Sequence, residues 1–213
     1  MHKFDPYEYI GVIIPGVVVV LTLILLYPEA SAVLSSGVTV GEFGLILILA
    51  IVAGHLIQAL GNAYEAVVWG VLGGMPTTWP AKKTTSLLSV KQRERLETAI
   101  RADFDAPLSE LASGRGPVRE INATVRAKGK TDRIEAFNRN YGLLRGISAA
   151  LIVAGALVVV VDRNDWVISL MLVAAAAVAT YRMTRFGQHY AREMFVEYLR
   201  CRDQSPDPKP GDK

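Results

Sequence analysis

Four runs of apolar residues divide the chain, and each is predicted to cross a lipid bilayer as a helix; the fourth has 16 residues, but its helical pattern continues beyond them. The runs are Tyr9 to Tyr27, Phe43 to Leu72, Leu143 to Val161 and Trp166 to Tyr181. A hydrocarbon core of about 30 Å needs about 20 predominantly apolar residues in α-helical conformation. The pattern therefore predicts an all-α membrane protein with four transmembrane helices.

Polar and charged residues between and after these runs divide the chain into five segments. We expect a first transmembrane hairpin in 1–74 (spans at about 9–27 and 43–72), a helical cytoplasmic insert in 75–141, a second transmembrane hairpin in 142–181, a cytoplasmic amphipathic helix in 182–202 and a disordered tail in 203–213. The predicted fold is thus two membrane hairpins, joined by a helical insert and followed by a helical C-terminal extension.

The first run contains a proline and precedes a motif that resembles a signal-peptidase site. Pro15 removes one helical hydrogen bond, so it either kinks the span or marks its true start. Ala30-Ser31-Ala32 has the small residues of a cleavage site, but the apolar run exceeds the roughly 7 to 15 residues of a signal peptide. We expect the first span to be retained, and its cleavage would leave the orientation of the other spans unchanged. The segment between the first two runs, 29–41, is expected to be a short external loop.

The insert contains three helical stretches. Ser89 followed by Gln92 fits a capping box that opens a helix through Phe104, and residues 118–127 favour a second, short helix. Thr131 can cap a third helix that continues into the third span. The insert has few large apolar residues, too few to build a hydrophobic core of its own. We therefore expect it to pack on the C-terminal helix or on a neighbouring copy.

Four polar residues interrupt the second run at steps of three, four and three, and we call them the polar seam: His55, Gln58, Asn62 and Glu65. At about 100° per residue they fall within one quarter of the helix circumference. Polar side chains at membrane depth are costly unless they face protein or water, so we expect the seam to turn inward. Gly54 and Gly61 flank it and allow another backbone to approach. Two interpretations stay open: the seam holds helices together, or it conducts or contacts a substrate.

A second stripe with the same spacing follows the fourth run, and it is basic: Arg182, Arg185, His189 and Arg192. It is either a solvated or headgroup-binding face, or a surface that meets Glu65 or an anionic ligand. Arg145, at the base of the third run, can snorkel toward the interface or pair with an acid.

Composition narrows the function classes. The chain is 51% hydrophobic with a mean hydropathy of +0.30, and its single cysteine, Cys201, excludes an internal disulfide. Since no motif has the spacing of a zinc site, P-loop, dinucleotide site or nucleophile elbow, we expect no metal and no cofactor. His55 and Glu65 are about 15 Å apart along the helix, too far to act on one bond, so we expect no enzyme.

The distribution of charge predicts the orientation in the membrane. Arg163 is the single basic residue in the segments 29–41 and 162–165. The positive-inside rule therefore places both termini and the insert in the cytoplasm. The lipid bilayer accounts for the isoelectric point of about 9.0 better than nucleic acid does, because acidic residues are mixed with the basic ones.

Three runs resemble small, mostly uncharacterised four-span inner-membrane proteins of bacteria: Gly54 to Asn62 (GHLIQALGN), Gly73 to Thr77 (GGMPT) and Tyr190 to Phe195 (YAREMF). In layout alone, the chain also resembles the membrane effectors of bacterial anti-phage systems. In those systems a small helical protein assembles and permeabilises the inner membrane after a cytoplasmic signal. The second resemblance implies a role in antiviral defence.

Two functions are therefore expected. The first is an oligomeric effector or channel-like protein, in which several copies bring their polar seams together and permeabilise the membrane after a cytoplasmic signal. The alternative is a non-conducting membrane anchor or adaptor. In both, the chain is a homo-oligomer in the lipid bilayer, and residues 77–140 and 182–202 meet a cytoplasmic protein or a nucleotide signal.

Overall fold

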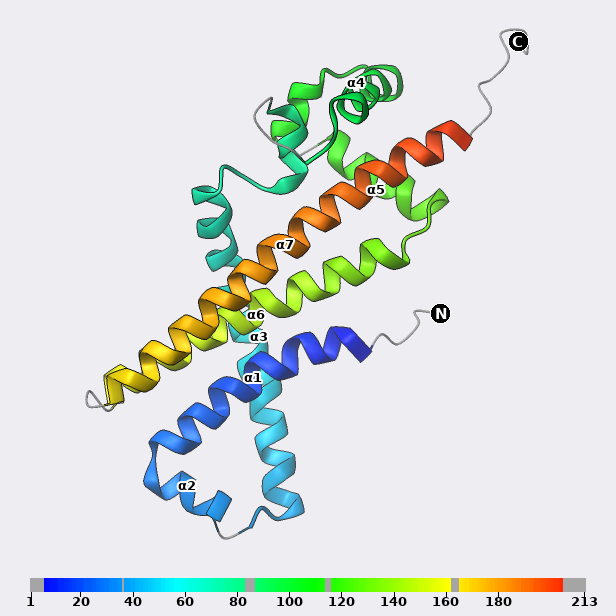
Figure 1. Cartoon of the computed structure of the whole chain (residues 1–213). Helices are drawn as coiled ribbons and strands as arrows, with labels where there is room; N and C mark the ends of the chain where they lie inside the picture. Colours follow the sequence, from blue (N-terminus) through cyan, green and yellow to red (C-terminus); the bar gives the residue numbers. More distant parts are fainter. Residues whose placement is uncertain (1–5, 36, 83–86, 114–115, 162–164, 205–213) are drawn as a thin grey trace, which may run out of the picture. The chain divides into compact units, whose positions relative to one another are not determined.

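The computed structural model describes residues 6–35, 37–82, 87–113, 116–161 and 165–204, and each regular element in these ranges is a helix (Figure 1). The α-helices are α1 (Pro6–Leu26), α2 (Pro28–Ser35), α3 (Val40–Val71), α4 (Val90–Phe104), α5 (Pro117–Lys128), α6 (Asp132–Val161) and α7 (Trp166–Gln204). Two 3-10 helices, η1 (Pro76–Ala81) and η2 (Leu108–Ser113), lie on either side of α4.

Four of these helices, α1, α3, α6 and α7, are long and apolar enough to cross a membrane. The prediction of an all-helical chain with four such helices is confirmed, and it indicates a membrane protein. α1 begins at Pro6 and continues through Pro15, so this proline does not mark the start of the span. The predicted turn at 162–165 and tail at 203–213 lie largely outside the described residues.

One short helix was missed by the sequence analysis. α2 occupies part of the segment 29–41, which was expected to be a loop. Pro28 stands at its first position and Glu29 in its first turn. Both residue types favour the start of a helix, because proline needs no partner for a missing N–H and a carboxylate complements the helix dipole.

The chain divides into two compact units. Unit 1 consists of Met1–Val68 and Arg139–Thr184, and unit 2 consists of Trp69–Asn138 and Arg185–Lys213. In unit 1, α6 and α7 run antiparallel (Figure 1), and the Ser169 hydroxyl of α7 donates to the Gly155 carbonyl of α6 at 2.8 Å. A small apolar cluster joins α1, α3 and α6 through Val19, Ile57, Ala149 and Ala150.

Glycines set how closely α1 and α3 approach each other. A Cβ atom added at Gly16 would overlap the carbonyl oxygen of Ala50, and one added at Gly54 would overlap the carbonyl oxygen of Val12. The two backbones are therefore in direct contact at these positions. This is the close packing that small residues allow between helices in lipid, where no hydrophobic force drives helix association.

Unit 2 has an apolar core that draws on five elements. Its buried residues come from α4, η2, α5, the start of α6 and the end of α7, and they include Leu96, Ile100, Leu111, Ile121, Val125, Ile134, Met194, Phe195 and Tyr198. The short helices of this unit thus obtain a core by packing on the C-terminal part of α7. The predicted capping box is present: the Gln92 N–H donates to Ser89 Oγ at 3.3 Å, and the Ser89 N–H donates to Gln92 Oε1 at 3.0 Å.

A tight turn in unit 2 ends α3. Gly73 and Gly74 have φ angles of +84° and +99°, which residues with a side chain rarely adopt. The turn brings the Trp79 ring edge-on to Trp69, with the ring centroids 6.1 Å apart. The Trp79 indole N–H donates to the Gly74 carbonyl at 2.8 Å. The paired glycines therefore stop the helix, and the tryptophans hold the turn that follows.

The contact between α1 and α3 predicts different effects for two glycines of α3. Gly54→Ala should destabilise the protein by about 1–3 kcal/mol, because the added methyl group separates the two backbones. Gly44→Ala should leave the stability unchanged or raise it slightly, since no atom lies within 4 Å of an added Cβ there. Thermal unfolding of the detergent-solubilised variants measures the difference. Equal melting temperatures would contradict the close approach at Gly54.

Candidate functional site

Two residues of the polar seam face a charged side chain of α6 within unit 1. Arg145 Nη1 lies 2.5 Å from Glu65 Oε2, and Arg145 Nη2 donates to Gln58 Oε1 at 3.1 Å. The side chains of Arg145 and Glu65 are only 21% and 15% exposed. Of the two alternatives for Arg145, the structure therefore shows pairing with an acid. The partner of Glu65 is thus a residue of α6.

Gln58 also reaches α1, at the position where a proline interrupts the hydrogen bonds of that helix. Its Nε2 atom donates to the Gly11 carbonyl at 2.7 Å. In a regular α-helix this carbonyl accepts from the N–H four residues later. That residue is Pro15, which has no N–H. Gln58 therefore satisfies the carbonyl that Pro15 leaves free inside α1.

These contacts form one chain of polar groups, which we call the polar relay: the Gly11 carbonyl, Gln58, Arg145 and Glu65. The relay joins α1, α3 and α6 of unit 1. Two glycines make room for it, since a Cβ at Gly146 would lie 2.7 Å from Gln58 Nε2 and one at Gly61 would lie 3.4 Å from Arg145 Cγ. The relay therefore depends on small residues beside it as well as on its own polar groups.

One atom of the relay is left over. Arg145 Nε is buried and has no hydrogen-bond partner among the described residues. A buried donor without a partner costs about 1–3 kcal/mol. The ion pair is therefore not optimal by itself, and the packing of α3 against α6 has to offset this cost.

A second polar cluster joins α3, α6 and α7 within unit 1. The Tyr64 hydroxyl lies 2.6 Å from Thr180 Oγ1, which lies 3.3 Å from Ser148 Oγ. Ser148 Oγ in turn donates to the Leu144 carbonyl at 2.8 Å. The hydrophobic pattern does not predict this cluster, although Tyr64 adjoins the polar seam and Thr180 ends the alanine-rich part of the fourth run. These residues belong to the helix contacts of unit 1.

The other two residues of the polar seam point away from the relay. His55 and Asn62 are exposed, and His55 lines a hollow of about 260 Å³ with Tyr9, Val12, Ile13 and Ile51. The expectation that the whole seam turns inward is therefore wrong for these two residues.

The geometry of an α-helix explains the split of the seam. At about 100° per residue, His55 and Asn62 lie about 20° apart, as do Gln58 and Glu65, and the two pairs are about 60° apart. Gln58 and Glu65 lie within the contact with α1 and α6, whereas His55 lies at its edge, beside the hollow that it lines with α1, and Asn62 is exposed. His55 also lies about 18 Å along α3 from Phe43, which is close to the middle of a hydrocarbon core of about 30 Å. Its exposure at that depth is unusual for a polar side chain.

The basic stripe is used partly for packing in unit 2. Arg192 Nε donates to the Leu87 carbonyl at 3.0 Å, and the His189 ring stacks on Phe137 with the ring centroids 5.4 Å apart. The 39 residues of α7 measure about 58 Å, which exceeds a hydrocarbon core of about 30 Å. Burial, followed by the charges of Arg185 and Arg192, lowers the pKa of His189. Arg182 and Arg185 are exposed.

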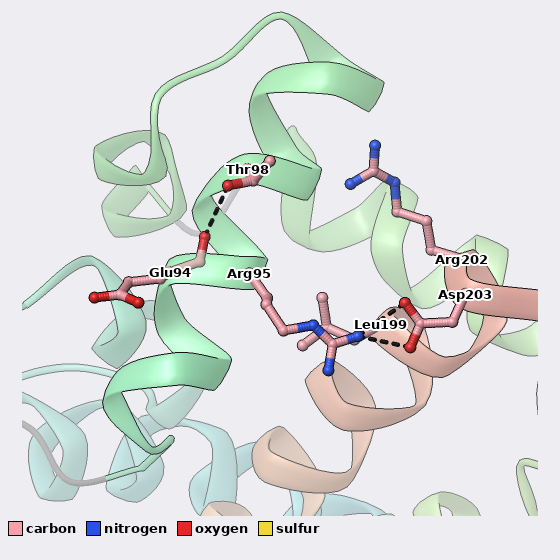
Figure 2. Close-up of a pocket in the computed structure, with 6 residues that line it drawn as sticks. All are labelled: Glu94, Arg95, Thr98, Leu199, Arg202 and Asp203. Atoms are coloured by element: carbon pink, nitrogen blue, oxygen red, sulfur yellow. Dashed lines mark hydrogen bonds and ion pairs between the residues drawn. The ribbon is translucent and has the colours of Figure 1, made fainter. Parts of the chain in front are cut away.

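A polar cleft lies between α4 and the end of α7 in unit 2 (Figure 2). It is lined by Glu94, Arg95, Thr98, Leu199, Arg202 and Asp203. Arg95 Nη2 contacts both carboxylate oxygens of Asp203, at 2.8 and 2.6 Å. Arg202 Nε lies 3.2 Å from Asp103 Oδ1. Since each guanidinium already has a carboxylate partner, the cleft holds α4 to α7 and is a poor site for an anion.

Comparisons of the chain with protein families, with curated proteins and with solved structures find no match. Within the part of the chain that the structure describes, no three His, Cys, Asp or Glu side chains gather in a way that could hold a metal ion. The function of the polar seam therefore has to be inferred from its own contacts.

The link between Pro15 and Gln58 can be tested with a double-mutant cycle. Gln58→Leu should destabilise the protein by about 1–3 kcal/mol, because it leaves the Gly11 carbonyl and one Arg145 nitrogen without a partner. Pro15→Ala supplies the missing N–H, so Gln58→Leu should cost about 1 kcal/mol less in that background. The melting temperatures of the four detergent-solubilised proteins give the interaction energy. Strictly additive effects would mean that Gln58 does not compensate for the proline.

Proposed function

We propose that the chain is an oligomeric membrane effector of the channel-like type, which permeabilises a bacterial inner membrane after a cytoplasmic signal. The observation that carries this proposal is the exposure of His55 and Asn62 on a helix that is long and apolar enough to cross a membrane. A polar side chain that faces lipid loses its hydrogen bonds to water without replacing them. Such a surface is stable only when a neighbouring protein or a water-filled path covers it.

The polar relay supports a division of the seam into two roles. Gln58 and Glu65 bond to α1 and α6 within the same chain. They hold the helices of unit 1 together. His55 and Asn62 make no such contact with the relay and are the seam residues that can line a polar path between copies. A path between copies also agrees with the small size of a bundle of four spans.

Unit 2 supplies the surface for a signal in this proposal. Its apolar core and its ion pairs hold α4 and the end of α7 together, so unit 2 is compact. Its segments directly follow or precede the membrane helices in the sequence. By the positive-inside rule, unit 2 and both termini lie in the cytoplasm. The four spans then form two hairpins. A cytoplasmic protein or a nucleotide that binds unit 2 would then control the assembly.

The alternative function is a non-conducting anchor or adaptor for a cytoplasmic partner. The polar relay favours it to the extent that half of the seam serves contacts between helices of one chain. In this case His55 and Asn62 also serve assembly alone, and no ion crosses the membrane.

Membrane potential in living bacteria distinguishes the two functions. We expect expression of the parent chain to depolarise cells that carry a voltage-sensitive dye. His55→Leu, Asn62→Leu should abolish the depolarisation, because the path loses its polar lining. The control Leu56→Ala, Leu60→Ala changes two exposed residues of the same helix and should depolarise like the parent. Membrane levels of all three proteins are matched by immunoblot.

Depolarisation by the His55→Leu, Asn62→Leu variant at the parental level would remove these residues from the path. Absence of depolarisation by the parent at every expression level, with a cytoplasmic protein captured through unit 2, would favour the adaptor.

A further inference from the structure

We infer that α3 carries a face through which parallel copies of this chain associate. The face consists of exposed residues at alternating steps of three and four: Leu45, Ile48, Val52, His55, Ala59, Asn62 and Ala66. The inference deepens the proposed function and rests on its premise that copies assemble. It names the contact between them, which we call the α3 face.

The spacing of the α3 face is that of a helix-packing seam. Alternating steps of three and four average 3.5 residues, the repeat that keeps one stripe facing a partner helix in a left-handed pair. At about 100° per residue, the seven residues lie within an arc of about 100°. The buried residues Ala50, Gly54, Ile57 and Gly61 lie on the other side, about 160° away. α3 therefore uses one side within the chain and leaves the α3 face exposed, with His55 at its edge beside the hollow that it shares with α1.

The side chains of the α3 face suit a contact between protein helices. Its first part is aliphatic, with Leu45, Ile48 and Val52 exposed by 58%, 60% and 55%. Its second part alternates the small residues Ala59 and Ala66 with the polar residues His55 and Asn62. Small residues let two backbones approach, and a polar side chain beside them can then bond across the contact. Lipid tails can cover the aliphatic part, but they cannot form hydrogen bonds with the Asn62 amide or the His55 imidazole.

Self-complementarity identifies the partner as a second copy. All copies insert into the membrane in the same direction, so their α3 helices run parallel, and residues of equal number face each other across a symmetric contact. Asn62 then meets Asn62 of the partner subunit. A side-chain amide has both donors and an acceptor, so two identical amides can bond to each other. A neutral histidine, with one donor and one acceptor nitrogen, is self-complementary in the same way.

Disulfide formation in membranes tests the α3 face. Ala59→Cys and Leu60→Cys are neighbours at nearly the same depth, both exposed, and point about 100° apart. Both are made in a Cys201→Ser background, because Cys201 is the single native cysteine. After oxidation, we expect most of the Ala59→Cys chain to run at twice its mass and severalfold less of the Leu60→Cys chain to do so. Equal cross-linking, or none at position 59 in protein that is present in the membrane, would overturn the inference.

The polar part of the α3 face is tested in the Ala59→Cys background. Asn62→Leu should lower the disulfide yield severalfold, whereas Asn62→Gln, which keeps the amide, should retain it. Leu56→Ala, which removes an exposed side chain outside the α3 face, should have no effect. An unchanged yield with Asn62→Leu would exclude the amide from the contact. Cross-linking of position 59 to a different protein in place of a second copy would overturn the inference in favour of that partner.

The dye measurement on the same cells separates this inference from the proposed function. Cross-linking at position 59 without depolarisation would leave the α3 face standing and remove the channel-like function. Depolarisation without cross-linking at position 59 would leave the channel-like function standing and remove the α3 face, since copies would then assemble through another surface.

Discussion

A carbonyl that Pro15 leaves without its helical partner fixes the contact between α1 and α3 in unit 1. Pro15 lies inside α1 and has no N–H to donate to the Gly11 carbonyl. Gln58 has to approach α1 closely enough to take over that bond. The approach requires glycine at positions 16 and 54, where the backbones of α1 and α3 touch. One missing N–H thus fixes where two helices cross and which residues allow it.

The same bond orients the polar groups of α3. Because Gln58 gives its amide N–H to α1, its oxygen faces α6 and accepts from Arg145. Arg145 then completes its charge balance with Glu65, two turns further along α3. Breaking a largely buried ion pair by removing one partner is costly, even where the intact pair adds little stability. The relay therefore selects one arrangement of α1, α3 and α6, and it adds little to the free energy of folding.

Once Gln58 and Glu65 are turned inward, His55 and Asn62 must lie at the edge of the buried side of α3. This consequence connects the packing of one chain with its assembly. The residues that hold α1, α3 and α6 together cannot also line a path, and the residues that are left outside need another partner. Unit 2 is built on a different principle, since its short helices share an apolar core with the end of α7 and its exposed ion pairs add about 0–1 kcal/mol each.

The elements that depend only on neighbouring residues could be predicted from the amino-acid sequence. The lengths of the apolar runs predicted the four long helices, and Ser89 with Gln92 predicted the start of α4, because these signals act within a few residues. Tertiary structure decided which side of α3 is buried. The partners of the seam lie far away in the sequence, 47 residues before Gln58 and 80 residues after Glu65. The pair His55 and Asn62 points only about 60° away from the pair Gln58 and Glu65. The hydrophobic pattern of the sequence cannot tell which of the two pairs is buried. Only the position of the Gly11 carbonyl and of the Arg145 guanidinium in space separates the two residues that join helices from the two that remain exposed.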